Sequence, residues 1–170
     1  GRGRAVGATN AAEGVDRNDV GRQRALAKGG SGRDDRTRAV ETVTAVKLPE
    51  AIATRAGGGV TRVIVDTPAT DTPAAGAAMR ACDLCLIPAR PTIFDIWSSE
   101  VTRGKLKTFA KEYCFVLHQC PPMQESQRVM DGAAALESMG GLLRPLVASR
   151  VAYQEAAREG MGTTEIEPDG

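Results

Sequence analysis

A short β-branched run that ends at an acidic residue is the feature of this sequence that most constrains the fold. Residues 63–65 (Val-Ile-Val) are followed by Asp66 and then at once by Thr67 and Pro68. An apolar run of this kind, closed by a turn signal, is typical of a strand buried on both faces of a parallel sheet. Ligands of open α/β sheets bind outside the carboxyl ends of such strands. Asp66 is therefore either a binding residue or the cap of a following turn or helix, and this motif alone leaves both open.

A carboxylate in that position has a specific chemical use. Magnesium is a hard cation that prefers oxygen ligands and keeps several waters, so Asp66 could hold a hydrated magnesium ion beside a phosphate chain. The rest of the sequence has to decide between this role and a structural one.

Size and charge exclude several classes of protein. The chain has 170 residues, is 42% hydrophobic and carries a formal net charge of +1. This is enough for one domain with a core, and no global field drives it onto nucleic acid or a membrane. No apolar stretch approaches the ~20 residues that cross a bilayer, and the Arg- and Gly-rich start lacks the apolar region of a secretory signal. We expect a cytoplasmic protein with no membrane partner.

Four cysteines raise a metal hypothesis, because a Cys-x-x-Cys pair is followed by a second pair (Cys82, Cys85, Cys114 and Cys120). Zinc pairs usually lie on turns, whereas Cys85 falls inside a strand-like run. We therefore expect free cysteines that pack as small apolar residues.

The chain divides by composition near residue 38. Residues 1–38 hold nine Lys or Arg against five Asp or Glu, contain no aromatic residue and show no periodicity, so we expect a basic, disordered segment. From residue 39 to residue 170, strand and helix patterns alternate as in βα units. The expected strands are 39–46, 62–66, 84–89, 114–118 and 142–148, and the expected helices are 48–56, 73–82, 93–113, 124–139 and 151–159.

This succession predicts an α/β fold, a mostly parallel sheet with helices on both faces. On the long helix at 93–113, the amphipathic pattern marks four candidate core residues: Ile96, Val101, Leu106 and Phe109.

Four segments together resemble the ParA/MinD family of plasmid and chromosome partition ATPases, over roughly residues 39–170 and in the family's order. They are Val-Ile-Val-Asp-Thr-Pro (63–68), Ala-Cys-Asp-Leu-Cys-Leu-Ile-Pro-Ala-Arg-Pro (81–91), Val-Leu-His-Gln-Cys-Pro-Pro (116–122) and Arg-Val-Ala-Tyr-Gln-Glu-Ala-Ala-Arg-Glu-Gly-Met-Gly-Thr-Thr-Glu (150–165). The resemblance implies a P-loop NTPase-like domain of the deviant Walker type. It also implies ATP and Mg as ligands, a homodimer around ATP, non-specific DNA binding and a partition adaptor protein that stimulates hydrolysis.

The resemblance also assigns roles to residues. Asp66 matches the acidic residue that organises magnesium and water near the γ-phosphate, which makes it the candidate catalytic and metal residue. Thr67 and Pro68 match the start of the nucleotide-sensing switch. The segment that passes the adenine corresponds to His118, Gln119, Pro121 and Pro122, with His118 where the family commonly has Asn.

The phosphate loop of the family is not recognisable. Residues 28–35 (Lys-Gly-Gly-Ser-Gly-Arg-Asp-Asp) imitate the opening of K-G-G-x-G-K-[ST]-[ST], but Arg33 replaces the lysine and Asp34 replaces a magnesium-binding hydroxyl. The alignment that fits better leaves out the family's first βαβ unit, whose central strand would neighbour the Asp66 strand. We expect an N-terminally incomplete domain, with either unpaired backbone groups or a changed strand pairing at that point.

Three interpretations follow, and the sequence leaves ATP hydrolysis open between the first two. The first is a ParA-like partition ATPase that is impaired in ATP binding as given. The second is a non-catalytic ParA-like relic or adaptor that keeps only the dimer and partner surfaces. The third is a basic-tailed DNA-binding protein in which residues 1–38 make the contact.

Overall fold

The computed structural model describes residues 42–67, 71–122, 126–159 and 161–163. These fall into two compact units, Val43–Ser149 and a C-terminal unit from Arg150, which are described separately. The expected basic segment 1–38, the loop-like run 28–35 and Pro68 lie outside the described residues.

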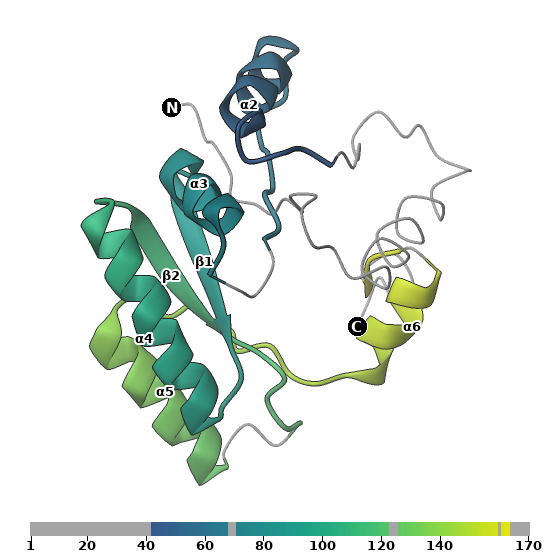
Figure 1. The fold of residues 1–170 in the computed structure, drawn as a ribbon. Helices are drawn as coiled ribbons and strands as arrows, with labels where there is room; N and C mark the ends of the chain where they lie inside the picture. The colour runs from purple at the N-terminus through teal and green to yellow at the C-terminus, as the bar shows by residue number, and fades with distance from the viewer. Residues whose placement is uncertain (1–41, 68–70, 123–125, 160, 164–170) are drawn as a thin grey trace. The chain divides into compact units, whose positions relative to one another are not determined.

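A parallel pair of strands forms the centre of the first unit (Figure 1). Strand β1 spans Leu84–Ala89 and strand β2 spans Glu112–Leu117, in a register that runs from Leu84 opposite Glu112 to Ala89 opposite Leu117. The bounds of β1 are those expected from the sequence, because its apolar run is closed by a charged residue at each end. Parallel pairing places the carboxyl ends of both strands at the same edge.

Two helices cover one face of this pair. Helix α4 spans Ile93–Thr108 and helix α5 spans Gln127–Met139, and Figure 1 shows them side by side against the strands. Alternate strand residues enter the core between them, which contains Ile87, Ala89, Leu106, Phe115, Leu117, Cys120, Val129, Ala133 and Leu136. Leu106 and Ile96 confirm the expected helix face, Phe109 is half-buried, and Val101 is exposed instead.

A second, smaller cluster lies around two further helices. Helix α2 spans Leu48–Gly57 and helix α3 spans Pro73–Ala81, each with proline in its first turn, where a missing N–H costs little. Thr72 caps α3, since its Oγ1 accepts a hydrogen bond of 3.2 Å from the amide of Ala75. Leu48, Val65 and Ala78 form the buried part of this cluster.

Two expected strands do not form. Residues 42–44 have no regular structure and residues 45–47 turn into α2, with the Lys47 amide bonded to the Thr44 carbonyl at 3.0 Å, so the strand expected at 39–46 is wrong over its described part. Residues 60–67 form neither helix nor strand. Val65 packs against α3 while Ile64 is 74% exposed, so this run is buried on one side only. A strand needs a ladder partner, and no strand in the described part of the chain pairs with it.

The long helix ends earlier than expected. Its chain reverses at Ala110, whose φ of 51° is left-handed, and the amide of Lys111 bonds to the carbonyl of Leu106 at 2.9 Å. This is a Schellman ending in which alanine takes the usual place of glycine. Residues 112–113 therefore belong to β2 and not to the helix.

The strand expected at 142–148 is reduced to two single bridges, Leu142 to Phe115 and Ala148 to Cys120. Pro145 between them has no N–H to donate to a ladder. The segment still covers the second edge of β2, because the Leu143 amide bonds to the Phe115 carbonyl at 2.8 Å and the Val147 amide to the Leu117 carbonyl at 3.0 Å. In the C-terminal unit, helix α6 spans Val151–Arg158, close to the expected bounds.

Candidate functional site at the carboxyl edge

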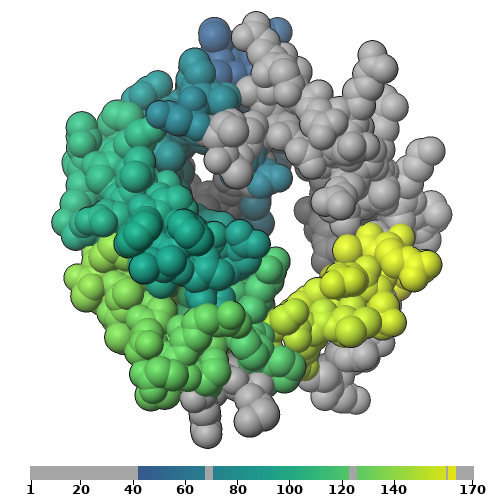
Figure 2. Space-filling view, turned by 60° about the horizontal axis from the view of Figure 1, so that its bottom comes forward, coloured from purple at the N-terminus to yellow at the C-terminus, as the bar shows by residue number. Residues whose placement is uncertain are grey.

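The loops that follow β1 and β2 meet at the carboxyl edge of the sheet. The amide of His118 donates a 2.9 Å hydrogen bond to the carbonyl of Ala89, which ties the end of one strand to the end of the other. In Figure 2, where the lower end of Figure 1 comes forward, the chain after β1 (teal) and the chain around β2 and α5 (green) form one continuous surface. This edge is where open α/β sheets bind ligands.

An ion pair fixes the loop after β1. Both side-chain oxygens of Asp95 accept from Arg90, Oδ2 from Nε at 2.6 Å and Oδ1 from Nη2 at 3.0 Å, and the Arg90 amide adds a third bond of 3.0 Å. Thr92 caps α4 by accepting from the Asp95 amide at 3.3 Å. The Arg90 guanidinium hydrogen-bonds to Asp95 and lowers the pKa of that carboxyl to about 2. Asp95 is thus a fixed anion that shapes the loop and not a proton acceptor near neutral pH.

The loop after β2 carries the candidate adenine residues. Burial lowers the pKa of His118, so its imidazole is neutral at neutral pH, and Asp95 and Arg90 act on it with opposite signs. Gln119 has a left-handed φ of 52°, a conformation that costs a non-glycine residue about 1 kcal/mol and is common at binding sites. Pro121 is half-buried and Pro122 is exposed. The loop is held by the Cys120 amide, which bonds to the Val147 carbonyl at 3.1 Å.

Asp66 lies at the surface, next to a groove that its neighbours line. Val65 is buried, Asp66 is exposed and Thr67 is half-buried. Val65 and Thr67 both line the groove, whereas Asp66 does not. The carboxylate is therefore at the rim and accessible to solvent.

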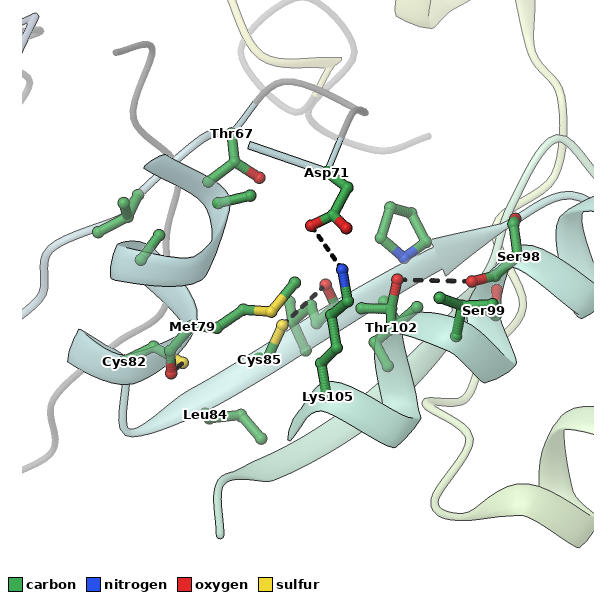
Figure 3. Close-up of a pocket in the computed structure, with 17 residues that line it drawn as sticks. Thr67, Asp71, Met79, Cys82, Leu84, Cys85, Ser98, Ser99, Thr102 and Lys105 are labelled. Atoms are coloured by element: carbon green, nitrogen blue, oxygen red, sulfur yellow. Dashed lines mark hydrogen bonds and ion pairs between the residues drawn. The ribbon is translucent and has the colours of Figure 1, made fainter. Parts of the chain in front are cut away.

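The groove has a volume of about 530 Å³ and runs along β1 (Figure 3). Every residue of Leu84–Pro88 contributes to it, so it follows an edge of the strand and not one face; β2 holds the other edge. Helix α3 contributes small and apolar side chains, and α4 contributes Ser98, Ser99 and Thr102. At its rim, Lys105 Nζ lies 2.5 Å from Asp71 Oδ1.

The structure places the sequence-predicted residues in two groups. Thr67 lines the groove with Asp66 beside it, and residues 118–122 follow β2 and do not line the groove. Among the described residues, no three His, Cys, Asp or Glu side chains gather as a metal site.

The described residues do not fit a complete nucleoside triphosphate site. Phosphates need amide or cationic donors, but the charged side chains that line the groove are Asp71, an acid, and Lys105, which is paired with it. Residues 28–35, whose sequence resembles the start of a phosphate loop, lie outside the described residues. The described part of the chain does not supply a phosphate cradle beside Asp66.

Two features of this region were missed by the sequence reasoning. The ion pair of Arg90 and Asp95 has a sequence signal, since Thr92-x-x-Asp95 resembles a capping box with Asp in place of Glu. The interaction between the Cys82 and Cys85 thiols depends on the turn between α3 and β1, and only their spacing hinted at it.

Comparisons with known proteins agree on the architecture. No family model matches the chain, and no curated protein matches it. Among solved structures, it is similar to the cell division ATPase MinD of Pyrococcus furiosus (24% identity, TM-score 0.61, 74% of this chain and 52% of that one). It is also similar to apo McdA of Cyanothece (16%, 0.64, 91% and 61%) and to the septum site-determining protein MinD of Pyrococcus horikoshii complexed with Mg-ADP (18%, 0.64, 99% and 77%).

The chain spans less than two thirds of the length of the first two of these proteins. Their identities are low, so the likeness concerns the fold. With its parallel strands, covering helices and ordered carboxyl edge, the chain has the P-loop NTPase-like fold of MinD and McdA, as its resemblance to the ParA/MinD family implied.

Proposed function

We propose that this chain is a ParA-like protein of plasmid or chromosome partitioning, whose ligands are ATP and Mg and whose ATP binding is weak in the chain as given. The observation that carries the proposal is the fold shared with MinD, one structure of which holds Mg-ADP. The placement of Asp66 and Thr67 beside β1, and of residues 118–122 at the carboxyl edge, supports it. Weak binding follows from the missing phosphate cradle among the described residues.

The proposed site residues keep the roles that the resemblance gave them. Asp66 would hold magnesium through water, with Thr67 and Pro68 beside it. His118, Gln119, Pro121 and Pro122 would border the adenine. A neutral imidazole at His118 suits contact with an uncharged base better than with a phosphate.

The proposed partners are a second copy of the chain, a partition adaptor protein and non-specific DNA, and the proposed location is the cytoplasm. In the described ranges, no helix combines the length and apolar character needed to span a bilayer.

A second candidate function is a non-catalytic ParA-like adaptor, favoured by an apolar stripe on α4. Ile93, Phe94, Trp97 and Val101 follow one another at helical spacing and are all exposed, and Phe94 contacts Trp97 edge-to-face with ring centroids 6.1 Å apart. Exposed apolar patches of this kind mark protein interaction surfaces. An adaptor would use this surface without needing ATP.

The experiment that tests the proposal is a titration of the full chain with ATP, with and without magnesium. We expect a dissociation constant of about 1 mM or weaker with magnesium, equivalent to about 4 kcal/mol. Asp66→Ala should weaken it about tenfold, the effect of losing one interaction of about 1.4 kcal/mol with a charged group. Asp131→Ala is the matched control, because it removes an equal charge from the exposed face of α5.

Three outcomes of this titration distinguish a weakly ATP-binding ParA-like protein from a non-catalytic adaptor. Magnesium-dependent binding that is lost in Asp66→Ala and kept in Asp131→Ala supports the proposal. No magnesium-dependent binding at several millimolar ATP points to the adaptor instead. Micromolar binding would contradict the expectation of an impaired site.

A further inference from the structure

The turn between α3 and β1 brings two thiols together at the wall of the groove. Cys82 is the C-cap residue directly after α3 and Cys85 is the second residue of β1. Both are half-buried and both line the groove, as Figure 3 shows. A thiol in such a position is accessible to small molecules, unlike Cys120 in the core.

The surroundings of the two sulfurs are unequal. The Cys85 thiol lies 3.8 Å from the Leu86 carbonyl, to which it can donate. Its hydrogen bond to Cys82, with the positive charge of Lys111, lowers the pKa of Cys82 to about 7, although burial and Asp83 act in the opposite direction. Lys111 is held nearby, since its Nζ donates a 3.1 Å hydrogen bond to the Cys82 carbonyl. The Cys82 thiol can also donate to the Met79 carbonyl at 3.2 Å, a bond that the thiolate gives up. The same contact with Cys82, together with burial, raises the pKa of Cys85.

We propose that Cys82 and Cys85 are a redox site. A low-molecular-weight disulfide such as oxidised glutathione oxidises the two thiols to a reversible intramolecular disulfide. Cys82 is the attacking residue and Cys85 the resolving residue. Neither residue has a role in the proposed nucleotide binding, although both line the groove that Thr67 also lines.

The exchange balances in two steps. The Cys82 thiolate attacks one sulfur of the small disulfide, whose S–S bond breaks and releases a thiolate that takes up a proton. The Cys85 sulfur then loses its proton and attacks the Cys82 sulfur, which releases the second small thiol. The protein loses two electrons and two protons, and one small disulfide becomes two thiols.

The second step becomes easier once the first has occurred. The pKa of Cys85 is raised chiefly by its hydrogen bond to the Cys82 sulfur, and the charge of the Cys82 thiolate contributes as well. In the mixed disulfide Cys82 carries no charge, so both effects weaken; burial still raises the pKa of Cys85, but Cys85 ionises more readily than before. The resolving cysteine is therefore protected until its partner has reacted.

The test uses the full chain incubated with oxidised glutathione at neutral pH, followed by alkylation and tryptic mapping. Trypsin places Cys82 and Cys85 in one peptide, 81–103, and Cys114 and Cys120 in another, 112–128, which serves as an internal control. We expect peptide 81–103 to lose two alkylation sites and two hydrogens, while 112–128 keeps both of its thiols. Reduced glutathione should restore the first peptide.

Variants separate a specific site from general thiol reactivity. Cys85→Ser should stop at a stable mixed disulfide on Cys82, and Cys82→Ser should leave Cys85 unmodified. Before oxidation, Cys82 should be alkylated at least about fivefold faster than Cys120 at neutral pH, because the pKa of Cys82 is lowered to about 7 while burial raises the pKa of Cys120. Cys85→Ala should slow Cys82 alkylation, and Cys85→Ser should keep it fast, since serine can still donate a hydrogen bond.

The proposal would be overturned by equal oxidation of the two peptides, by disulfides between copies of the chain, or by two free thiols in 81–103 in the presence of excess oxidised glutathione. Each of these results leaves the proposed nucleotide function untouched, so the two proposals can fail independently.

Discussion

Phe115→Ala is expected to lower the free energy of unfolding by about 4 kcal/mol. Phe115 is fully buried at the centre of β2, where it packs in the main core and meets Tyr113 edge-to-face with centroids 5.7 Å apart. Its removal deletes a large apolar side chain and leaves a cavity that β1, α4 and α5 cannot fill without moving. Domains of this size are stable by about 5–15 kcal/mol, so roughly a quarter to four fifths of the free energy of unfolding would be lost.

The measurement is urea unfolding followed by circular dichroism, and the matched control is Phe94→Ala. Phe94 is 74% exposed on α4, so the same substitution there should change stability by less than about 0.5 kcal/mol. Equal effects at the two positions would mean that the core does not lie between β2 and these helices.

Gly140→Ala is expected to cost about 2 kcal/mol through a collision with a side chain that cannot move aside. A Cβ at position 140 would lie 2.7 Å from Cε2 and 3.0 Å from the hydroxyl of Tyr113. Tyr113 is held by two hydrogen bonds: its hydroxyl donates to the Met139 carbonyl at 3.0 Å and accepts from Arg103 Nε at 3.2 Å. Arg103 Nε also donates to the Met139 carbonyl at 2.7 Å.

The neighbouring glycine is the control for this effect. A Cβ at Gly141 meets only the Cys114 sulfur at 3.9 Å, an ordinary contact, so Gly141→Ala should be much milder in the same unfolding assay. In a Tyr113→Ala background the collision is gone, and Gly140→Ala should add little. If it costs as much there as in the natural sequence, the collision is not the cause.

Local signals predicted the elements whose ends are chemically marked. Prolines in the first turn located the starts of α2 and α3. The apolar run closed by Asp83 and Arg90 gave β1 its bounds. The helix expected at 93–113 was too long because its end has no such marker. Ala110 takes the left-handed conformation there, and only a glycine at that position would have marked the end in the sequence.

Strand pairing could not be predicted in the same way. The β-branched run at 63–65 has the composition of a strand, but whether it joins a sheet depends on a neighbour elsewhere in the chain. In the described residues the sheet ends at β1, and a groove lies between β1 and this run. The sequence interpretation found no first βαβ unit and left open either unpaired backbone groups or a changed strand pairing here, and it still expected a buried strand.

In the candidate site, too, positions that follow from local patterns could be predicted, and contacts between distant residues could not. Residues 118–122 could be assigned to a strand end because the strand expected at 114–118 overlaps β2, and the structure places them at the carboxyl edge, directly after Leu117. The fixed state of Asp95 and the unequal thiols at Cys82 and Cys85 arise from contacts across turns, so composition and periodicity could not give them.

The central claim is that Asp66–Thr67 and residues 118–122 border one weak nucleotide site. Amide hydrogen exchange of the full chain, with and without about 10 mM Mg-ATP, tests it most directly, since a 1 mM site would slow exchange up to about tenfold. The account predicts slower exchange in peptides covering 62–67 and 117–122 together, with α5 as an unchanged reference. Exchange that is unaltered in both peptides, or slowed only elsewhere, would contradict it.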